Sequence, residues 1–242
     1  TLTIVLKSTD GSTVRAYPYP ILTWHEIVND TIGDTPVAVT FCPLCGSAIV
    51  FDRTLPDGTV STFGVSGSLL ESNMIMYDRA TESLWQQSTG RSLAGTHHPA
   101  TLAVVPMQRL TIGELRTLYP TASVLSENTG YQRDYSRTPY SSYEERHDAF
   151  YFVPSHIDSS LPAKTIVAVV VIGDSTVALP WQELRAAGGT TFTHDGHTLT
   201  ITLRDGELTV SNEEGTAYPF YFEMWFSYAV QHHNRATLIP VT

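Results

Sequence analysis

The sequence predicts an α+β fold dominated by β-strands, mostly antiparallel, with a few short helices and two degenerate structural repeats. Short apolar runs are separated by Asp-Gly pairs, at residues 10–11, 57–58, 195–196 and 205–206. Such pairs between β-branched runs are typical of hairpins. Long segments with a helical period of apolar residues are scarce. We therefore expect hairpins to build most of the molecule.

The N-terminal segment predicts two strands and a helix. Residues 1–7 alternate apolar and polar side chains, which predicts a strand, and residues 12–17 follow as a second strand after a turn. Residues 21–29 place large side chains at positions i, i+3, i+4 and i+7. This spacing predicts a short helix with His25 on or beside its buried face. Taken alone, such a histidine is more often a core-edge residue than a ligand.

The only two cysteines, Cys42 and Cys45, lie between two apolar runs at residues 37–41 and 48–51. The runs predict two strands, and the proline and glycine between them predict a tight turn. We therefore expect a β-hairpin that carries both thiols at its tip. The turn is similar to half of a metal-binding knuckle. A complete zinc or iron knuckle normally needs a second cysteine pair, which this sequence lacks.

Further along, residues 74–79 predict a strand in which Met74 and Met76 share one face. Methionines in such positions most often fill a core. Gln86 and Gln87 follow Trp85 directly. They indicate one of two environments: buried backbone groups to which the amides hydrogen-bond, or a polar pocket that the amides line. Residues 111–119 predict a helix that begins with a capping box.

Residues 11–18 are similar to residues 173–180, with Gly, Ala and Pro at matching positions, which predicts a degenerate internal duplication. The first repeat would span residues 1–127 and carry the cysteine hairpin. Residues 128–163 would form an aromatic loop that wraps the body, and residues 164–242 the second repeat. The second repeat has no cysteines, so we expect any chemistry to belong to the first.

Composition narrows the class of partners. A formal net charge of −10 argues against non-specific binding to nucleic acid or to anionic membranes. No run of 18 apolar residues occurs, so we expect no transmembrane helix. The chain starts at Thr1 without a methionine, which suggests a processed N-terminus. We therefore expect an extracytoplasmic protein that is secreted, periplasmic or surface-anchored after removal of a signal.

Several motifs within residues 11–160 are typical of one family. They are Ala16-Tyr17-Pro18, the run from Trp24 to Asp30, the run from Pro36 to Cys45, the run from Phe63 to Gly67, Met76-Tyr77-Asp78-Arg79, Trp85-Gln86-Gln87 and the run from Gly130 to Arg137. In these motifs the chain resembles the DUF3179 family of bacterial and archaeal proteins of unassigned function. The resemblance implies an extracytoplasmic location and implies no catalytic residues.

The leading functional hypothesis is a soft-metal site, with copper as the expected ion. Two thiolates hold Cu(I), and the imidazole of His25 and the thioether of Met76 would complete a Cys42, Cys45, His25, Met76 ligand set. Such a site would support electron transfer, copper carriage or an oxidase-type reaction. Zinc or iron are the alternatives, with Glu26 in place of Met76. The surrounding pocket would contain Trp24, Glu26, Asn29, Met74, Asp78, Arg79, Trp85 and Gln86.

Two other classes of function stay open. CxxC spacing is also that of thiol–disulfide oxidoreductases, although Cys45 leads into a β-run instead of a helix that would lower its pKa. Alternatively the pair is inert, and the protein is a non-catalytic extracytoplasmic binding or structural module. The substrate, the redox partner and whether the protein is an enzyme are left open by the sequence.

Overall fold

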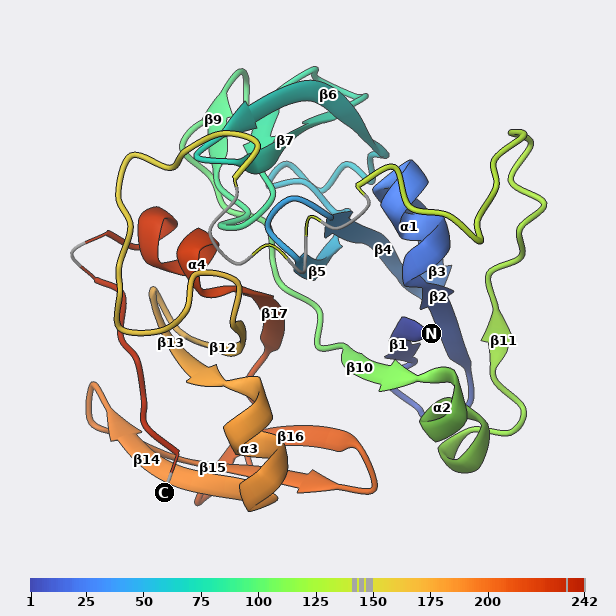
Figure 1. Cartoon of the computed structure of the whole chain (residues 1–242). Coiled ribbons are helices and arrows are strands. Elements are labelled where there is room, and N and C mark those ends of the chain that lie inside the picture. The colour runs from blue at the N-terminus through green and yellow to red at the C-terminus, as the bar shows by residue number, and fades with distance from the viewer. Residues whose placement is uncertain (141–142, 144–145, 147–149, 234, 242) are drawn as a thin grey trace.

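The computed structural model describes residues 1–140, 143, 146, 150–233 and 235–241. The described residues form an α+β fold in which β-strands dominate and the four helices are short, as predicted (Figure 1). No helix among these residues has the length and apolar character that crossing a membrane requires.

A central antiparallel sheet of six strands contains residues from both predicted repeats. At the middle of this sheet, Ala48 of the cysteine hairpin pairs with Phe222, which belongs to a strand near residue 220. The strands, in spatial order, are β13 (Ser175–Pro180), β12 (Ile166–Ile172), β17 (Phe220–Met224), β5 (Ser47–Asp52), β4 (Thr35–Cys42) and β3 (Ile27–Ile32).

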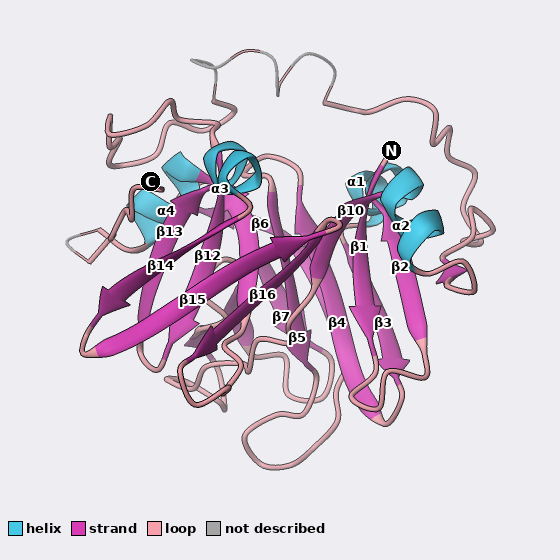
Figure 2. Ribbon diagram, turned by 90° about the horizontal axis from the view of Figure 1, so that it is seen from below, coloured by secondary structure: helices cyan, strands magenta, loops and turns pink. Residues whose placement is uncertain are grey.

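Three smaller sheets surround the central one (Figure 2). All their pairings are antiparallel except that between β11 and β2, which is parallel. The first sheet contains β10 (Gln108–Thr111), β1 (Leu2–Lys7), β2 (Val14–Pro18) and β11 (Ser123–Val124). The second sheet contains β14 (Gly189–His194), β15 (His197–Arg204) and β16 (Glu207–Asn212). The third sheet contains β6 (Phe63–Leu70), β7 (Asn73–Asp78), β8 (Leu84–Gln86) and β9 (Ser92–Ala94).

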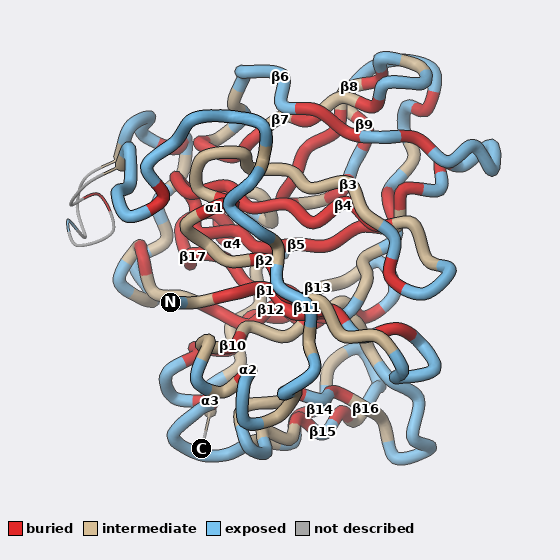
Figure 3. The backbone as a smooth tube through the Cα atoms, turned by 90° about the vertical axis from the view of Figure 1, so that its right-hand side faces the viewer, coloured by how far each residue is buried: buried red, intermediate tan, exposed pale blue. Residues whose placement is uncertain are grey.

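Both faces of the central sheet are buried, which explains why β4 and β5 are almost continuously apolar (Figure 3). Alternate residues of β4 point to opposite sides. Val37, Val39 and Phe41 belong to the core shared with the β1–β2 and β14–β16 sheets. Ala38 and Cys42 belong to a second core, shared with the β6–β9 sheet and the helix after β17. The cysteines therefore lie inside this second core.

The helices are α1 (Tyr19–His25), α2 (Ile112–Leu118), α3 (Trp181–Ala187) and α4 (Trp225–Gln231). The predicted capping box of α2 is present, with Thr111 and Glu114 bonded to each other's backbone N–H groups. The prediction of a helix over residues 21–29 was wrong in its second half. Helix α1 starts two residues earlier and ends at His25, because Glu26 takes a positive φ of 60°. The β-branched residues that follow pair with β4 instead.

The two similar segments of the predicted duplication have the same local structure. Residues 14–18 and residues 175–180 are both strands that end in proline and continue directly into a short helix. The proposed division at residues 127 and 163 stays a prediction. The central sheet takes strands from both sides of that division, so these two parts of the chain pack together in one sheet.

Candidate functional site

The two cysteines flank a tight turn between β4 and β5. Cys42 is the last residue of β4, and the backbone N–H of Cys45 donates to its carbonyl over 3.3 Å. Gly46 takes a φ of 58°, and a Cβ there would lie 3.0 Å from Cγ of Met224. The N–H of Met224 in turn donates to the carbonyl of Cys45 over 2.9 Å. Strand β17 therefore fixes the turn from the side, and glycine is the residue that fits its backbone.

Both thiols are free and buried. The sulfur of Cys45 lies 3.2 Å from Nδ2 of Asn73, which donates to it, and 3.0 Å from Oγ of Ser47. The Oε1 atom of Gln87 accepts from Ser47 over 2.5 Å and from Asn73 over 2.8 Å, and its Nε2 donates to the hydroxyl of Thr40 over 2.9 Å. A closed network of buried polar side chains thus surrounds one of the two sulfurs.

The hydroxyl of Ser47 has one proton and two neighbours that can accept it. When Cys45 is a thiol, its S–H donates to Ser47 and Ser47 donates to Gln87. When Cys45 is a thiolate, the hydroxyl proton turns to the sulfur. Gln87 still accepts from Asn73 in that state. The site can therefore accommodate both protonation states of Cys45 without leaving Gln87 Oε1 unpaired.

The two thiols differ in acidity. Burial opposes ionisation of Cys45, but hydrogen bonds from Cys42, Ser47 and Asn73 outweigh it and lower the pKa of Cys45 to about 7. The pKa of Cys42 is raised well above its ordinary value by its hydrogen bond to Cys45 and then by burial. As the pH rises through about 7 the pair therefore keeps one proton, held by Cys42, beside a thiolate at Cys45.

A buried carboxyl group lies behind this network. The N–H of Ser88 donates to Oδ1 of Asn73 over 2.8 Å, and the Ser88 hydroxyl donates to Oε2 of Glu223 over 3.0 Å. Glu223 is fully buried, and its Oε1 has no hydrogen-bond partner among the described residues. Burial, reinforced by the charge of Cys45, raises the pKa of Glu223 to about 8. The carboxyl group is therefore neutral at pH 7.

On the side of Cys42, the thiol pair contacts the turn between β6 and β7. The sulfur of Cys42 lies 3.9 Å from the carbonyl of Ser72, whose hydroxyl donates to the carbonyl of Phe152 over 2.5 Å. Glu71 and Ser72 both take positive φ values, 51° and 63°, which is costly for residues other than glycine. Ser72 also lines a surface groove of about 390 Å³. Ser72 thus lines the groove and also contacts the thiol pair.

Of the predicted ligands, the structure brings Cys42, Cys45 and Met76 into one buried cluster, and Met74 joins them there. His25 has a different partner, because its Nε2 lies 2.6 Å from the hydroxyl of Tyr135. The described residues contain no group of three or more His, Cys, Asp or Glu side chains placed to hold a metal ion. The four-ligand set stays a prediction.

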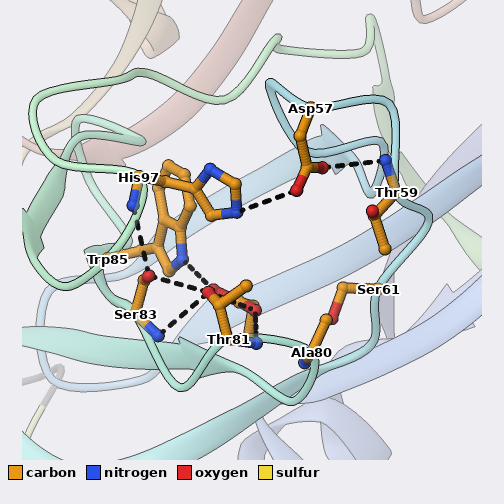
Figure 4. Close-up of polar contacts among 9 residues, drawn as sticks. Asp57, Thr59, Ser61, Ala80, Thr81, Ser83, Trp85 and His97 are labelled. Carbon is orange, nitrogen blue, oxygen red and sulfur yellow. Dashed lines mark hydrogen bonds and ion pairs between the residues drawn. The ribbon is translucent and has the colours of Figure 1, made fainter.

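Most residues of the predicted pocket stabilise backbone or one another. Asp78 is fully buried and accepts from the indole N–H of Trp85 over 2.9 Å, beside the polar contacts of Ser83 and His97 (Figure 4). The remaining contacts are these: Asn29 bonds both backbone groups of Phe63, Arg79 donates to the Phe63 carbonyl, Trp24 donates to the Arg137 carbonyl, and Gln86 donates to Gln231.

Glu26 is half-buried in strained backbone, and burial raises its pKa to about 6. Its carbonyl accepts from the N–H of Phe41, which places it next to the end of β4. The charge of Glu26 is also one cause of the raised pKa of Cys42, so Glu26 lies near the thiol pair.

The sequence-based prediction missed five residues of the site: Ser47, Asn73, Gln87, Ser88 and Glu223. Asn73 and Gln87 directly neighbour the predicted Met74 and Gln86. The pair of amides at residues 86–87 was a usable signal, since it predicts a polar pocket or buried backbone. Nothing local in the sequence marks Glu223.

The chain belongs to a family of proteins of unknown function, DUF3179, whose family model matches residues 3–234. No curated protein and no solved structure matches the chain.

Replacing Asn73 by leucine should raise the pKa of Cys45 by about one pH unit or more, because the thiolate loses a hydrogen-bond donor. The pKa is measured from the ultraviolet absorbance of the thiolate during a pH titration. Asn29→Leu is the matched control, since the side chain of Asn29 bonds, among the described residues, to the backbone of Phe63 alone. An unchanged pKa in Asn73→Leu would show that Asn73 does not stabilise the thiolate.

Glu223→Gln should weaken the dependence of stability on pH. Glu223 has a pKa of about 8 in the folded chain against an ordinary value of 4.5. Between these values the unfolded chain releases a proton that the folded chain keeps, so stability falls with rising pH, by up to about 1.4 kcal/mol per pH unit. Urea unfolding at several pH values in this window measures the slope. The exposed Glu213→Gln variant should keep the wild-type slope, and an equal slope in Glu223→Gln would contradict the assignment.

Proposed function

We propose that Cys42 and Cys45 form a thiol–disulfide redox centre that cycles between a dithiol and a disulfide. The observation that carries the proposal is the pair of contacts to the Cys45 sulfur, from Asn73 at 3.2 Å and from Ser47 at 3.0 Å. Oxidoreductases of this type need one thiol to ionise near neutral pH. Here side-chain donors provide what a helix N-terminus provides in other CxxC proteins.

The reaction balances as a two-electron exchange. The thiolate of Cys45 attacks one sulfur of a disulfide, whose S–S bond breaks and releases the other sulfur as a thiolate. Cys42 then loses its proton and attacks the Cys45 sulfur. The bond between Cys45 and the bound sulfur breaks, and the second thiolate leaves. The pair ends as a disulfide, and the partner has gained both electrons and, from water or Cys42, its protons.

Access limits the partner to a small molecule or an exposed loop. Cys42 is 2% exposed and Cys45 is not exposed at all. The groove is lined by Ser72, whose carbonyl lies 3.9 Å from the Cys42 sulfur, so a partner would enter there once the contact between Ser72 and Phe152 opens. Disulfide exchange also fits the expected extracytoplasmic location, where oxidising conditions prevail.

The pair should form an intramolecular disulfide reversibly, with a midpoint potential in the range of catalytic dithiols, about −120 to −270 mV. Equilibration in glutathione buffers, with thiol counting by mass spectrometry, measures it. Cys42→Ser should trap a mixed disulfide at Cys45, whereas Cys45→Ser should trap little, because burial still raises the pKa of the remaining thiol after the Cys45 sulfur is gone. A potential below about −300 mV would indicate a structural disulfide, and no disulfide in any buffer would contradict the proposal.

A second candidate function is binding of a soft metal ion, with copper as Cu(I) before zinc or iron. The observation that favours it is the position of Met74 and Met76, whose side chains share one buried cluster with both cysteines. Thiolates and thioethers are ligands that suit Cu(I). His25 would join this set only by exchanging the hydroxyl of Tyr135 for the metal.

Copper binding predicts uptake of one Cu(I) per chain under anaerobic conditions, measured by competition with a chromophoric chelator. Cys42→Ser should abolish uptake, and Met76→Leu should weaken it by about tenfold, the loss of about 1.4 kcal/mol. His25→Ala shows whether His25 takes part. Met107→Leu is the control, since Met107 belongs to the opposite core. Uptake that survives Cys42→Ser would exclude this site as the copper site.

A further inference from the structure

A large cleft among the described residues is separate from the thiol pair. It has a volume of about 1070 Å³ and lies between segments of both predicted repeats. One wall is the turn between β8 and β9, which includes Ser88 and Arg91. The C-terminal end of α4 and the turn that follows also line it, with His232 and Arg235. Clefts between structural halves, with a few convergent polar groups, are the usual places of small-molecule sites.

Two arginines of this cleft lack a carboxylate partner. Arg91 and Arg235 form no ion pair with any described acidic residue. Their backbones are fixed all the same: Arg91 pairs with Thr101, and the N–H of Arg235 donates to the carbonyl of His232 over 2.7 Å. On a chain of net charge −10, two unpaired guanidinium groups in one cleft indicate a site for a negative group.

His232 adds a hydrogen-bonding atom to this end of the cleft. Its Nδ1 lies 3.4 Å from the hydroxyl of Thr176, and its Nε2 is buried without a partner among the described residues. The Thr176 hydroxyl also lies 3.4 Å from the hydroxyl of Tyr228, the other group to which it can donate. When it donates to Nδ1, the proton of the neutral ring is on Nε2, which then is a donor with no acceptor among the described residues. Burial, and then the charge of Arg91, lowers the pKa of His232 to about 4, so the ring is neutral at pH 7.

The acidic residues of the cleft belong to its other walls. Asp174 and Asp195 lie in the β12–β13 and β14–β15 turns. Asp195 is already engaged, because its Oδ2 accepts from the hydroxyl of Ser175 over 2.8 Å and lies 3.2 Å from Nε2 of His194. No acidic residue contributes to the pKa of His232, whereas Arg91 does. The end that contains Arg91 and His232 is therefore the positive end.

We propose that this cleft binds a small carboxylate or phosphate anion between Arg91, Arg235 and the Nε2 atom of His232. The guanidinium groups would give charge-assisted hydrogen bonds and the imidazole N–H a third donor. The site is independent of the thiol chemistry proposed above. It shares one residue with the surroundings of Cys45, because Ser88 lines the cleft and also bonds to Asn73 and Glu223.

The test is thermal unfolding in increasing sodium phosphate and, in a separate series, sodium succinate, with ionic strength held constant by sodium chloride. We expect a saturable rise of the unfolding midpoint with at least one of the two anions, and the series that responds identifies the group. Arg91→Gln and Arg235→Gln should each weaken the apparent affinity by about tenfold. Arg116→Gln, an exposed arginine of α2, is the charge-matched control and should bind as the wild type does.

A second measurement does not depend on stability. The ring nitrogens of His232 should change their NMR chemical shift when the anion that binds is added, and Arg91→Gln should reduce this change. No midpoint rise with either anion beyond sodium chloride would overturn the proposal. An equal loss of affinity in Arg116→Gln would also overturn it, since it would show a general charge effect. Neither result bears on the redox centre, whose test uses the cysteine variants.

Discussion

The hydrogen bond from Asn73 to the sulfur of Cys45 is the contact on which the candidate site depends. Asn73 begins β7 of the β6–β9 sheet, and Cys45 lies in the turn of the central sheet, so this bond joins two sheets. Gln87 closes the same network through Ser47 and Thr40. A hydrogen bond to a charged group contributes about 1.5–3 kcal/mol, and each buried polar atom left unpaired costs about 1–3 kcal/mol. The network is therefore stable only when complete.

Because the buried polar groups of the site hydrogen-bond to one another, they are stable inside an apolar core. Cys42 and Cys45 are surrounded by aromatic and aliphatic side chains of the second core, which bury both sulfurs. In such surroundings each donor on the Cys45 sulfur acts strongly, because the local dielectric is low. The same surroundings keep Glu223 neutral. Burial opposes a charge at both groups: at Cys45 the hydrogen bonds outweigh it, whereas at Glu223 burial prevails.

The sequence was sufficient to predict what adjacent residues determine. The cysteine hairpin, the strand with Met74 and Met76, and the capping box of α2 all follow from local patterns and are confirmed. The prediction of a helix through residue 29 was wrong, because the pairing of Ile27–Ile32 with β4 overrode the helical spacing. The donors to Cys45 could not be predicted: Asn73 is 28 residues away in sequence, and Glu223 is 135 residues from Ser88.

The pairing of β5 with β17 also affects how the molecule forms. The turn that carries the thiols takes a hydrogen bond from Met224, and Ala48 finds its partner in Phe222. Contacts between residues so distant in sequence form late, after the intervening chain has been synthesised. Until then both thiols are open to any oxidant that the nascent chain meets. Folding itself closes that period, since completion of the central sheet buries both sulfurs.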